Sequence, residues 1–172
     1  SSNPGTVTIT VTPANDLPTT IETEISTDED NSVDSVLQAV DVDQDSLTFT
    51  VTQNPTHGDV TYPIPSTGIF TYTPDPNYHG TDTFKFKAND GTGDSNASIV
   101  TVTIAPVNDP PVVGDYPFTI VEDTNLADVK LSGDDIDSSY LTFTVSRSAN
   151  HGSVSLDSNT DTFTYAPNTD YH

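Results

Sequence analysis

The chain repeats itself about every 93 residues, and this internal period constrains its fold more than any single motif. Residues 8–18 match residues 101–111, and the Leu-Thr-Phe-Thr-Val block at residues 47–51 returns at residues 141–145. Self-similarity at a fixed period is the signature of a tandem array of equivalent structural units. The short acidic segment at each junction between copies is called the seam below.

The length of the repeat predicts the domain organisation. One immunoglobulin-like sandwich takes about 100 residues, which is close to the repeat length. We therefore expect residues 1–14 to be the last strand of a preceding copy, residues 15–107 a complete copy, and residues 108–172 a second copy truncated before its last two strands. A sandwich without those strands exposes an unpaired edge, so either further sequence or another chain is expected to cover it.

Alternating runs of Thr, Val, Ile and Phe predict β-strands throughout the chain. No window holds a helical period longer than about two turns. The alternation places Leu47, Phe49 and Val51 on one face of a strand and the intervening threonines on the other. The complete copy is expected to contain seven strands, near residues 19–26, 33–40, 46–53, 58–62, 68–73, 82–88 and 96–105. The sequence thus predicts an all-β chain of immunoglobulin-like Greek-key β-sandwiches.

The charge balance limits the partners that the chain can have. Four basic residues against 26 acidic ones give a formal net charge of −22, which excludes nucleic acid and anionic membrane as electrostatic partners. The sequence contains no cysteine, so disulfides and thiolate metal sites are excluded. No apolar stretch is long enough for membrane insertion. Cations are the expected counterparts of so many carboxylates.

The acidic residues concentrate at strand ends and at the seams. Several carboxylates with Asn and backbone oxygens suit a hard cation such as Ca²⁺, which takes six to eight oxygen ligands. Two carboxylates about 4 Å apart repel each other by about 4 kcal/mol at an effective dielectric constant near 20. A seam with four or five of them is therefore expected to need a cation.

The pattern at the seams resembles the cadherin-like tandem repeats of bacterial surface proteins and large adhesins. The stretch Phe84-Lys85-Phe86-Lys87-Ala88-Asn89-Asp90-Gly91, followed by residues 100–111, is similar to the final hairpin and Asx-rich linker of that family. The resemblance covers essentially the whole chain. It implies a cadherin-like sandwich in each copy and Ca²⁺ at each linker.

The resemblance also implies a ligand set for each seam. At the seam between the two copies, Asp75 is the better candidate of its motif, because Asn77 stands where the family has glutamate. The ligands implied there are Glu29, Asp75, Asn108, Asp109, Asp135 and Asp137. The ligands implied at the upstream seam are Asn15, Asp16, Asp41, Asp43 and Asp90. The family's first linker aspartate is replaced by Pro13 and Pro106, so we expect one or two ions per seam.

Simpler interpretations exist for several of these residues. Aspartate and asparagine also mark turns without any metal. Asp45 extends the 41–45 loop into something like the start of an EF-hand, but Ser46 is not the glycine that motif requires, so a sandwich loop is expected. His57-Gly58 and His151-Gly152 recur in the two copies, and a turn before a strand is expected for them, since no cysteine accompanies these histidines and imidazoles alone are too few for a zinc site.

Aromatic residues of the repeat raise a further alternative. Phe70, Tyr72 and Tyr78 would suit a sugar-stacking platform, but their alternation favours packing in the core or at an edge. No nucleophile, base and orienting group recur together, so no enzyme activity is expected.

These observations predict a calcium-rigidified structural or adhesive segment of a large secreted, extracellular surface protein, with neighbouring repeats of the same parent chain as its partners. The alternative is a calcium-dependent module that binds polysaccharide or another cell surface, with avidity from the array. A third expectation is homophilic assembly by strand addition, with residues 6–12 completing the truncated copy of another chain.

Overall fold

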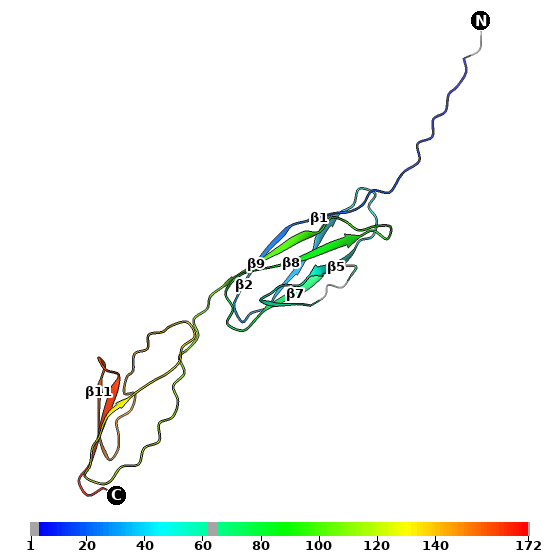
Figure 1. Cartoon of the computed structure of the whole chain (residues 1–172). Coiled ribbons are helices and arrows are strands. Elements are labelled where there is room, and N and C mark those ends of the chain that lie inside the picture. The colour runs from blue at the N-terminus through cyan, green and yellow to red at the C-terminus, as the bar shows by residue number, and fades with distance from the viewer. Residues whose placement is uncertain (1–3, 62–64, 172) are drawn as a thin grey trace. The chain divides into compact units, whose positions relative to one another are not determined.

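The computed structural model describes residues 4–61 and 65–171, which form twelve strands and no helix. None of these described residues builds a helix long and apolar enough to cross a membrane. The chain divides into two compact units (Figure 1): unit 1 runs to Val107, and unit 2 begins at Asn108. The expectation of an all-β chain is confirmed.

Unit 1 is a sandwich of two main sheets and a short ribbon. Its strands are β1 (Thr19–Ile21), β2 (Thr23–Asp28), β3 (Val33–Val36), β4 (Gln38–Val40), β5 (Thr48–Gln53), β6 (Gly58–Thr61), β7 (Ile69–Pro74), β8 (Gly80–Asn89) and β9 (Ser98–Ala105). One sheet has the order β2-β9-β8-β5 and the other has the order β3-β7-β6, while β1 pairs with β4. β2 and β9 run parallel, and the other pairs are antiparallel.

Two of the seven expected strands divide, because the chain changes sheet partway along them. The run near residues 19–26 forms β1, which pairs with β4, and β2, which pairs with β9. The run near residues 33–40 forms β3 and β4 on either side of Leu37, whose amide donates to the Gly68 carbonyl at 2.9 Å. Strands that switch sheets in this way close the corners of a sandwich. Each expected segment contains strand, and Tyr62, at the end of the fourth, lies outside the described residues.

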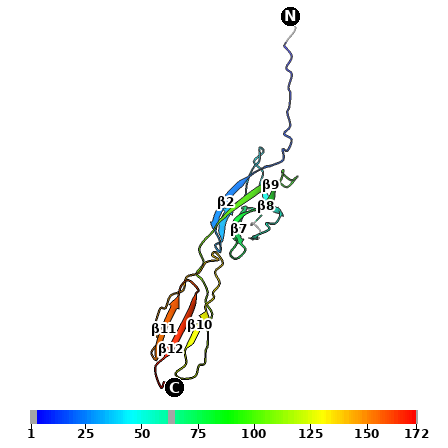
Figure 2. The same cartoon turned by 60° about the vertical axis from the view of Figure 1, so that its left-hand side comes forward.

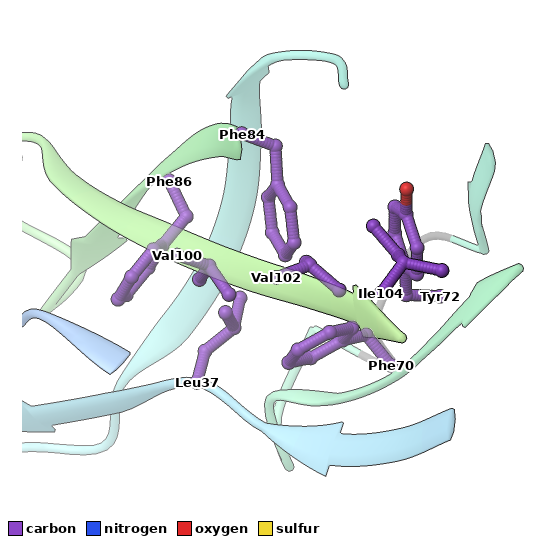
Figure 3. Close-up of a cluster of buried hydrophobic side chains, with 8 residues drawn as sticks. All are labelled: Leu37, Phe70, Tyr72, Phe84, Phe86, Val100, Val102 and Ile104. Atoms are coloured by element: carbon purple, nitrogen blue, oxygen red, sulfur yellow. The ribbon is translucent and has the colours of Figure 1, made fainter. Parts of the chain in front are cut away.

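The core of unit 1 lies between the two main sheets (Figure 3). Phe84 and Phe86 on β8 are fully buried, whereas Lys85 and Lys87, the residues that follow each of them, are not, as the alternation predicts. Phe70 packs edge-on against Phe84, with ring centroids 5.2 Å apart. The complete cluster is Leu37, Phe70, Tyr72, Phe84, Phe86, Val100, Val102 and Ile104. Phe70 and Tyr72 are therefore core residues, which confirms that interpretation over a sugar-stacking platform.

A buried carboxylate joins β8 to the turn that precedes β6. Asp82 accepts hydrogen bonds from the amides of Thr56 (3.1 Å) and His57 (2.8 Å), and from the Tyr72 hydroxyl (3.0 Å). It also accepts from the amide of Thr83 at 2.8 Å. Burial alone would raise the pKa of Asp82, but these amide donors hold it below its ordinary value. Burial and the bond to Asp82 raise the pKa of Tyr72 above its ordinary range.

The turn at His57-Gly58 recurs at His151-Gly152 with the same contacts. The Tyr72 hydroxyl donates to the His57 carbonyl at 3.1 Å, and in unit 2 a tyrosine hydroxyl donates to the His151 carbonyl at 2.9 Å. The His57 ring stacks on Tyr78 with centroids 4.0 Å apart, and His151 stacks likewise at 4.2 Å. These contacts support the turn role expected for both histidines.

Gly58→Ala is expected to destabilise unit 1 by about 1–3 kcal/mol, the usual cost of overpacking. A methyl group at this position would lie 2.5 Å from the Thr73 carbonyl oxygen and 2.7 Å from the Tyr72 hydroxyl. Urea unfolding followed by circular dichroism measures the change. Gly5→Ala is the control, since nothing lies within 4 Å of the added group there. A Gly58→Ala chain as stable as this control would contradict the prediction.

A second pair of loops also recurs in both units. Asp30 and Asn77 have left-handed backbone angles, with φ of 59° and 57°, and the Asn77 amide donates to the Asp30 carboxylate at 2.9 Å. Asp123 and Asp170 in unit 2 have φ of 59° and 57°, and the Asp170 amide donates to Asp123 at 3.1 Å. Asp and Asn tolerate this backbone region better than other residues with a side chain. Each of these bonds stays within its own repeat.

The described residues of unit 2, 108–171, form a single three-stranded sheet of order β10-β12-β11 (Figure 2). Its strands are β10 (Leu126–Lys130), β11 (Gly152–Asp157) and β12 (Thr162–Pro167). This sheet corresponds to β3-β7-β6 of unit 1. Residues 116–121 and 142–147, the counterparts of β2 and β5, form no strand. The reason is strand pairing. In unit 1, β2 pairs only with β9, and β5 pairs only with β8. The described part of unit 2 contains no counterpart of β9 or β8, so these segments have no strand to pair with.

Candidate metal sites

The loop after β4 folds around the carboxylate of Asp41. Both Asp43 and Asp45 donate their backbone amides to Asp41 Oδ1, at 2.9 Å and 3.3 Å. Gln44 adopts a left-handed φ of 64°, which helps the loop to curl. As a result, one carboxylate oxygen from each of Asp41, Asp43 and Asp45 lies within 4.8 Å of the other two.

The second oxygen of Asp41 distinguishes this loop from an ordinary turn. Asp41 Oδ2 is buried and has no hydrogen-bond partner among the described residues. An unpaired buried acceptor costs free energy, and a charged one costs more than a neutral one. Three converging carboxylates with such an oxygen form a site that a cation would stabilise.

The segment before β1 is tied to this loop and to a second one. The Asp16 amide donates to Asp43 Oδ2 at 2.7 Å. The Asn15 side-chain amide donates to Asp90 Oδ2 at 2.9 Å and to the Thr92 hydroxyl at 2.9 Å. All five residues expected at the upstream seam therefore belong to one hydrogen-bonded group within unit 1.

Asp90 is held as a carboxylate by the loop that follows it. The pKa of Asp90 is well below its usual range, chiefly because of the Asn15 amide and then the backbone amides of Thr92 (2.7 Å) and Gly93 (2.8 Å). Gly91 adopts a φ of 94°, which lets the loop turn back onto Asp90. Asp90 is therefore charged at neutral pH and already oriented by four donors.

Unit 2 repeats the part of this geometry that involves Asp16, Asp43 and Asp41. The Asp109 amide donates to Asp137 Oδ2 at 2.5 Å, and the Asp137 amide donates to Asp135 Oδ1 at 2.9 Å. The Asn108 side chain donates to the Asp109 carbonyl at 2.8 Å, as Asn15 does to Asp16 at 3.2 Å. Ser139 stands where unit 1 has Asp45, so this loop has one carboxylate fewer.

Glu29 and Asp75 lie in unit 1 and are not joined to each other by any hydrogen bond within the described residues. Glu29 is 2% exposed, and its Oε1 accepts the Val107 amide at 2.6 Å, just after β9. Asp75 is exposed, and its amide donates to the His57 carbonyl at 2.9 Å. The ligand set that joins these two residues to Asn108, Asp109, Asp135 and Asp137 of unit 2 remains a prediction.

Sequence reasoning left out two residues of the upstream group. Asp45 contributes a third carboxylate to the 41–45 loop, and its Asp-x-Asp-x-Asp spacing was the available signal. Thr92 accepts from Asn15 and donates to Asp90, and nothing in the sequence pattern singled it out. Asp45 lies in a sandwich loop, as expected.

Two family models together account for nearly the whole chain. The model described as a bacterial cadherin-like domain matches residues 15–106, and the one described as a bacterial Ig domain matches residues 108–172. Domains of both kinds are non-catalytic structural modules typical of bacterial surface and adhesion proteins. The cadherin-like fold generally binds calcium.

The chain is also similar to individual proteins, and one solved structure, with a TM-score of 0.50, shares its fold. Integrin beta-like protein B of Dictyostelium discoideum is 32% identical over 112 residues, covering 57% of this chain but only 6% of that protein. The EC1-2 fragment of human protocadherin-24 (Form II) is 19% identical, covers 90% of this chain and 81% of its own, and has a TM-score of 0.50. Drosophila N-cadherin EC1-4 is 17% identical, covers 90% and 41%, and has a TM-score of 0.49.

Proposed function

This chain belongs to the family of bacterial cadherin-like domains, and on that basis we propose that it is a calcium-stiffened structural or adhesive segment of a large extracellular surface protein. The observation that carries the proposal is the buried oxygen of Asp41, which has no hydrogen-bond partner within the described part of the chain and lies beside the carboxylates of Asp43 and Asp45. Ca²⁺ is the ion of choice because the whole ligand set is oxygen, with no cysteine in the chain.

Asp43 gives the site its mechanical role. One of its oxygens accepts the Asp16 amide, so the carboxylate fixes the chain segment that enters unit 1. The same side chain belongs to the cluster around Asp41. When bound, Ca²⁺ neutralises the repulsion among these carboxylates and holds the 41–45 loop in place. The entering segment then keeps its direction, because its anchor no longer moves.

Asn15 and Asp90 add a second anchor to the entering segment. Their 2.9 Å hydrogen bond ties the segment to the loop after β8. Two anchors on consecutive residues restrict bending better than one. Asp109, Asp137 and Asp135 repeat the first of them in unit 2, so the same device is proposed at the seam between repeats.

The alternative role, binding of polysaccharide or of another cell surface, would favour exposed aromatic side chains on a flat sheet face. The outer face of β8 instead presents Thr81, Thr83, Lys85 and Lys87. The structural role is therefore the better supported of the two.

Calcium titration of the chain tests the proposal. Isothermal titration calorimetry is expected to detect Ca²⁺ binding that Asp41→Asn weakens, because the substitution removes a charge from the centre of the unit 1 cluster. Free Ca²⁺ at about 100 times its Kd should stabilise unit 1 by about 2.7 kcal/mol. Asp109→Ala is expected to weaken binding at the second seam while leaving the unit 1 site intact.

Asp59→Asn is the matched control, since Asp59 is an exposed acid on β6 outside both seams. It removes the same charge and should leave the titration unchanged. Equal Ca²⁺ binding by wild type, Asp41→Asn and Asp59→Asn would refute the proposed site. Binding without any change in thermal stability or in small-angle scattering would refute the stiffening role.

A further inference from the structure

The side chain of Asp45 differs from the other two carboxylates of the 41–45 loop. Asp41 and Asp43 each accept backbone amides, from within the loop and from Asp16. The carboxylate of Asp45 is exposed and accepts no hydrogen bond from residues 4–61 or 65–171. One of its oxygens nevertheless lies within 4.8 Å of oxygens of Asp41 and Asp43. Without an ion, this side chain therefore adds repulsion to the loop and no bond.

The backbone of the loop, not its side chain, places Asp45 in the cluster. The Asp45 amide donates to Asp41 Oδ1 at 3.3 Å, and the Gln44 amide donates to the Asp41 carbonyl at 3.4 Å. Gln44 has a φ of 64°, in a region that residues with a side chain seldom adopt. All these contacts lie within five consecutive residues. The three carboxylates therefore converge without a residue from any other repeat.

The corresponding loop of unit 2 contains Asp135, Asp137 and Ser139 at the same spacing. Asp135 Oδ1 accepts the amides of Asp137 at 2.9 Å and of Ser138 at 2.7 Å, so this loop closes one residue earlier than the loop of unit 1. Ser139 carries a neutral hydroxyl where Asp45 carries a charge. No group of three such acidic ligands forms among the described residues of unit 2.

We propose that the fifth residue of each loop sets the affinity of that loop for Ca²⁺, within the calcium-stiffening role proposed above, and that Asp45 is an ion ligand which unit 2 lacks. Three carboxylates repel one another, and a divalent cation among them replaces this repulsion with attraction. In loops of oxygen ligands, the affinity for Ca²⁺ depends on the number of charged ligands. Ser139 leaves its loop with one charge fewer.

The first residue of the loop explains why the ion binds there and not elsewhere on an acidic surface. Asp41 Oδ2 is buried and has no hydrogen-bond partner among the described residues. Folding of the loop has already removed water from this oxygen, so an ion gains the ligand without a further desolvation cost. Asp45 then supplies its charge from the exposed side of the loop.

Calcium titration followed by two-dimensional ¹H–¹⁵N NMR tests each loop separately, because Asp43 and Asp137 each carry an amide that belongs to one loop only. Two substitutions exchange the fifth residues between the units. Asp45→Ser is expected to raise the Kd of the unit 1 loop about tenfold and to leave that of the unit 2 loop unchanged. Ser139→Asp is expected to lower the Kd of the unit 2 loop by about the same factor.

Two further variants separate the ligand from general effects of charge and folding. Asp45→Asn keeps the shape of the side chain and one oxygen but removes the charge, so it should also raise the Kd of the unit 1 loop. Asp59→Ser removes the same charge from an exposed position on β6 and should change neither loop. Far-UV circular dichroism without Ca²⁺ is expected to be the same for all variants, since the Asp45 carboxylate is exposed.

Failure of this proposal is distinct from failure of the calcium-stiffening role. Ca²⁺ binding at both loops, with a Kd that either exchange leaves unchanged, would overturn the role of the fifth residue and leave calcium stiffening standing. An effect of Asp59→Ser on the unit 1 loop as large as that of Asp45→Ser would overturn it as well, since total charge would then be the cause. A wild type in which Ca²⁺ changes neither loop would overturn both.

Discussion

Asp82→Ala is expected to lower the free energy of unfolding of unit 1 by about 3–5 kcal/mol, because it leaves several donors without an acceptor. The Thr56, His57 and Thr83 amides and the Tyr72 hydroxyl all donate to this one carboxylate. Tyr72 is fully buried, so water cannot replace the lost partner there. Native-state hydrogen exchange of the β8 and β9 amides measures the change in unit 1 separately from unit 2.

The pH dependence gives a second readout of the same substitution. The folded-state pKa of Asp82 lies below its ordinary value of 3.8. Its contribution to stability is therefore present above pH 3.8 and is lost as the pH falls through the folded-state pKa. The difference between wild type and Asp82→Ala should shrink over that acidic range. Asp59→Ala is the control, and a loss of stability as large as that of Asp82→Ala would show that charge alone is responsible.

Phe84→Ala is expected to destabilise unit 1 by about 3–5 kcal/mol, the usual cost of an aromatic truncation in a packed core. Phe84 is fully buried and packs against Phe70 across the two main sheets. The cavity left behind lies between the sheets, where both backbones are fixed by ladder pairing and cannot collapse into it. Hydrogen exchange of the β7, β8 and β9 amides is expected to speed up together.

Ile69→Ala is the matched control for Phe84→Ala. Ile69 neighbours Phe70 on β7 but is 51% exposed, so its truncation opens no cavity. It should cost less than about 1 kcal/mol, as surface substitutions commonly do. Similar losses for both variants would mean that the sheets are not packed through Phe84.

The sequence allowed the strands and the core of unit 1 to be predicted because local alternation determines both. Phe84 and Phe86 were expected on one face, and that face is the buried one. The division of the first two runs was not foreseen. No glycine or proline marks Glu22 or Leu37 as a break, and the break arises from the choice of ladder partner, which is a long-range property.

The same reasoning explains why unit 2 departs from its sequence pattern. The Leu-Thr-Phe-Thr-Val block forms β5 in unit 1 but no strand at residues 141–145. The residues are nearly identical, so propensity is not the cause. A strand at the edge of a sandwich forms only when its neighbour is present, and the neighbour of β5 is β8.

The upstream group of acidic residues was predictable from a resemblance, not from physical chemistry alone. Asn15 and Asp90 are 75 residues apart in sequence, and no local pattern brings them together. The third carboxylate, Asp45, could have been predicted from the Asp-x-Asp-x-Asp spacing. The burial of Glu29 could not be predicted from the sequence, since its partner, the Val107 amide, lies beyond the end of β9.

The loop contacts between Asp30 and Asn77, and between Asp123 and Asp170, have a consequence for how such a protein can change in length. Each contact is internal to its own repeat, so adding or deleting a whole repeat breaks none of them. A gene encoding these repeats can therefore expand or contract by unequal recombination without new compensating mutations.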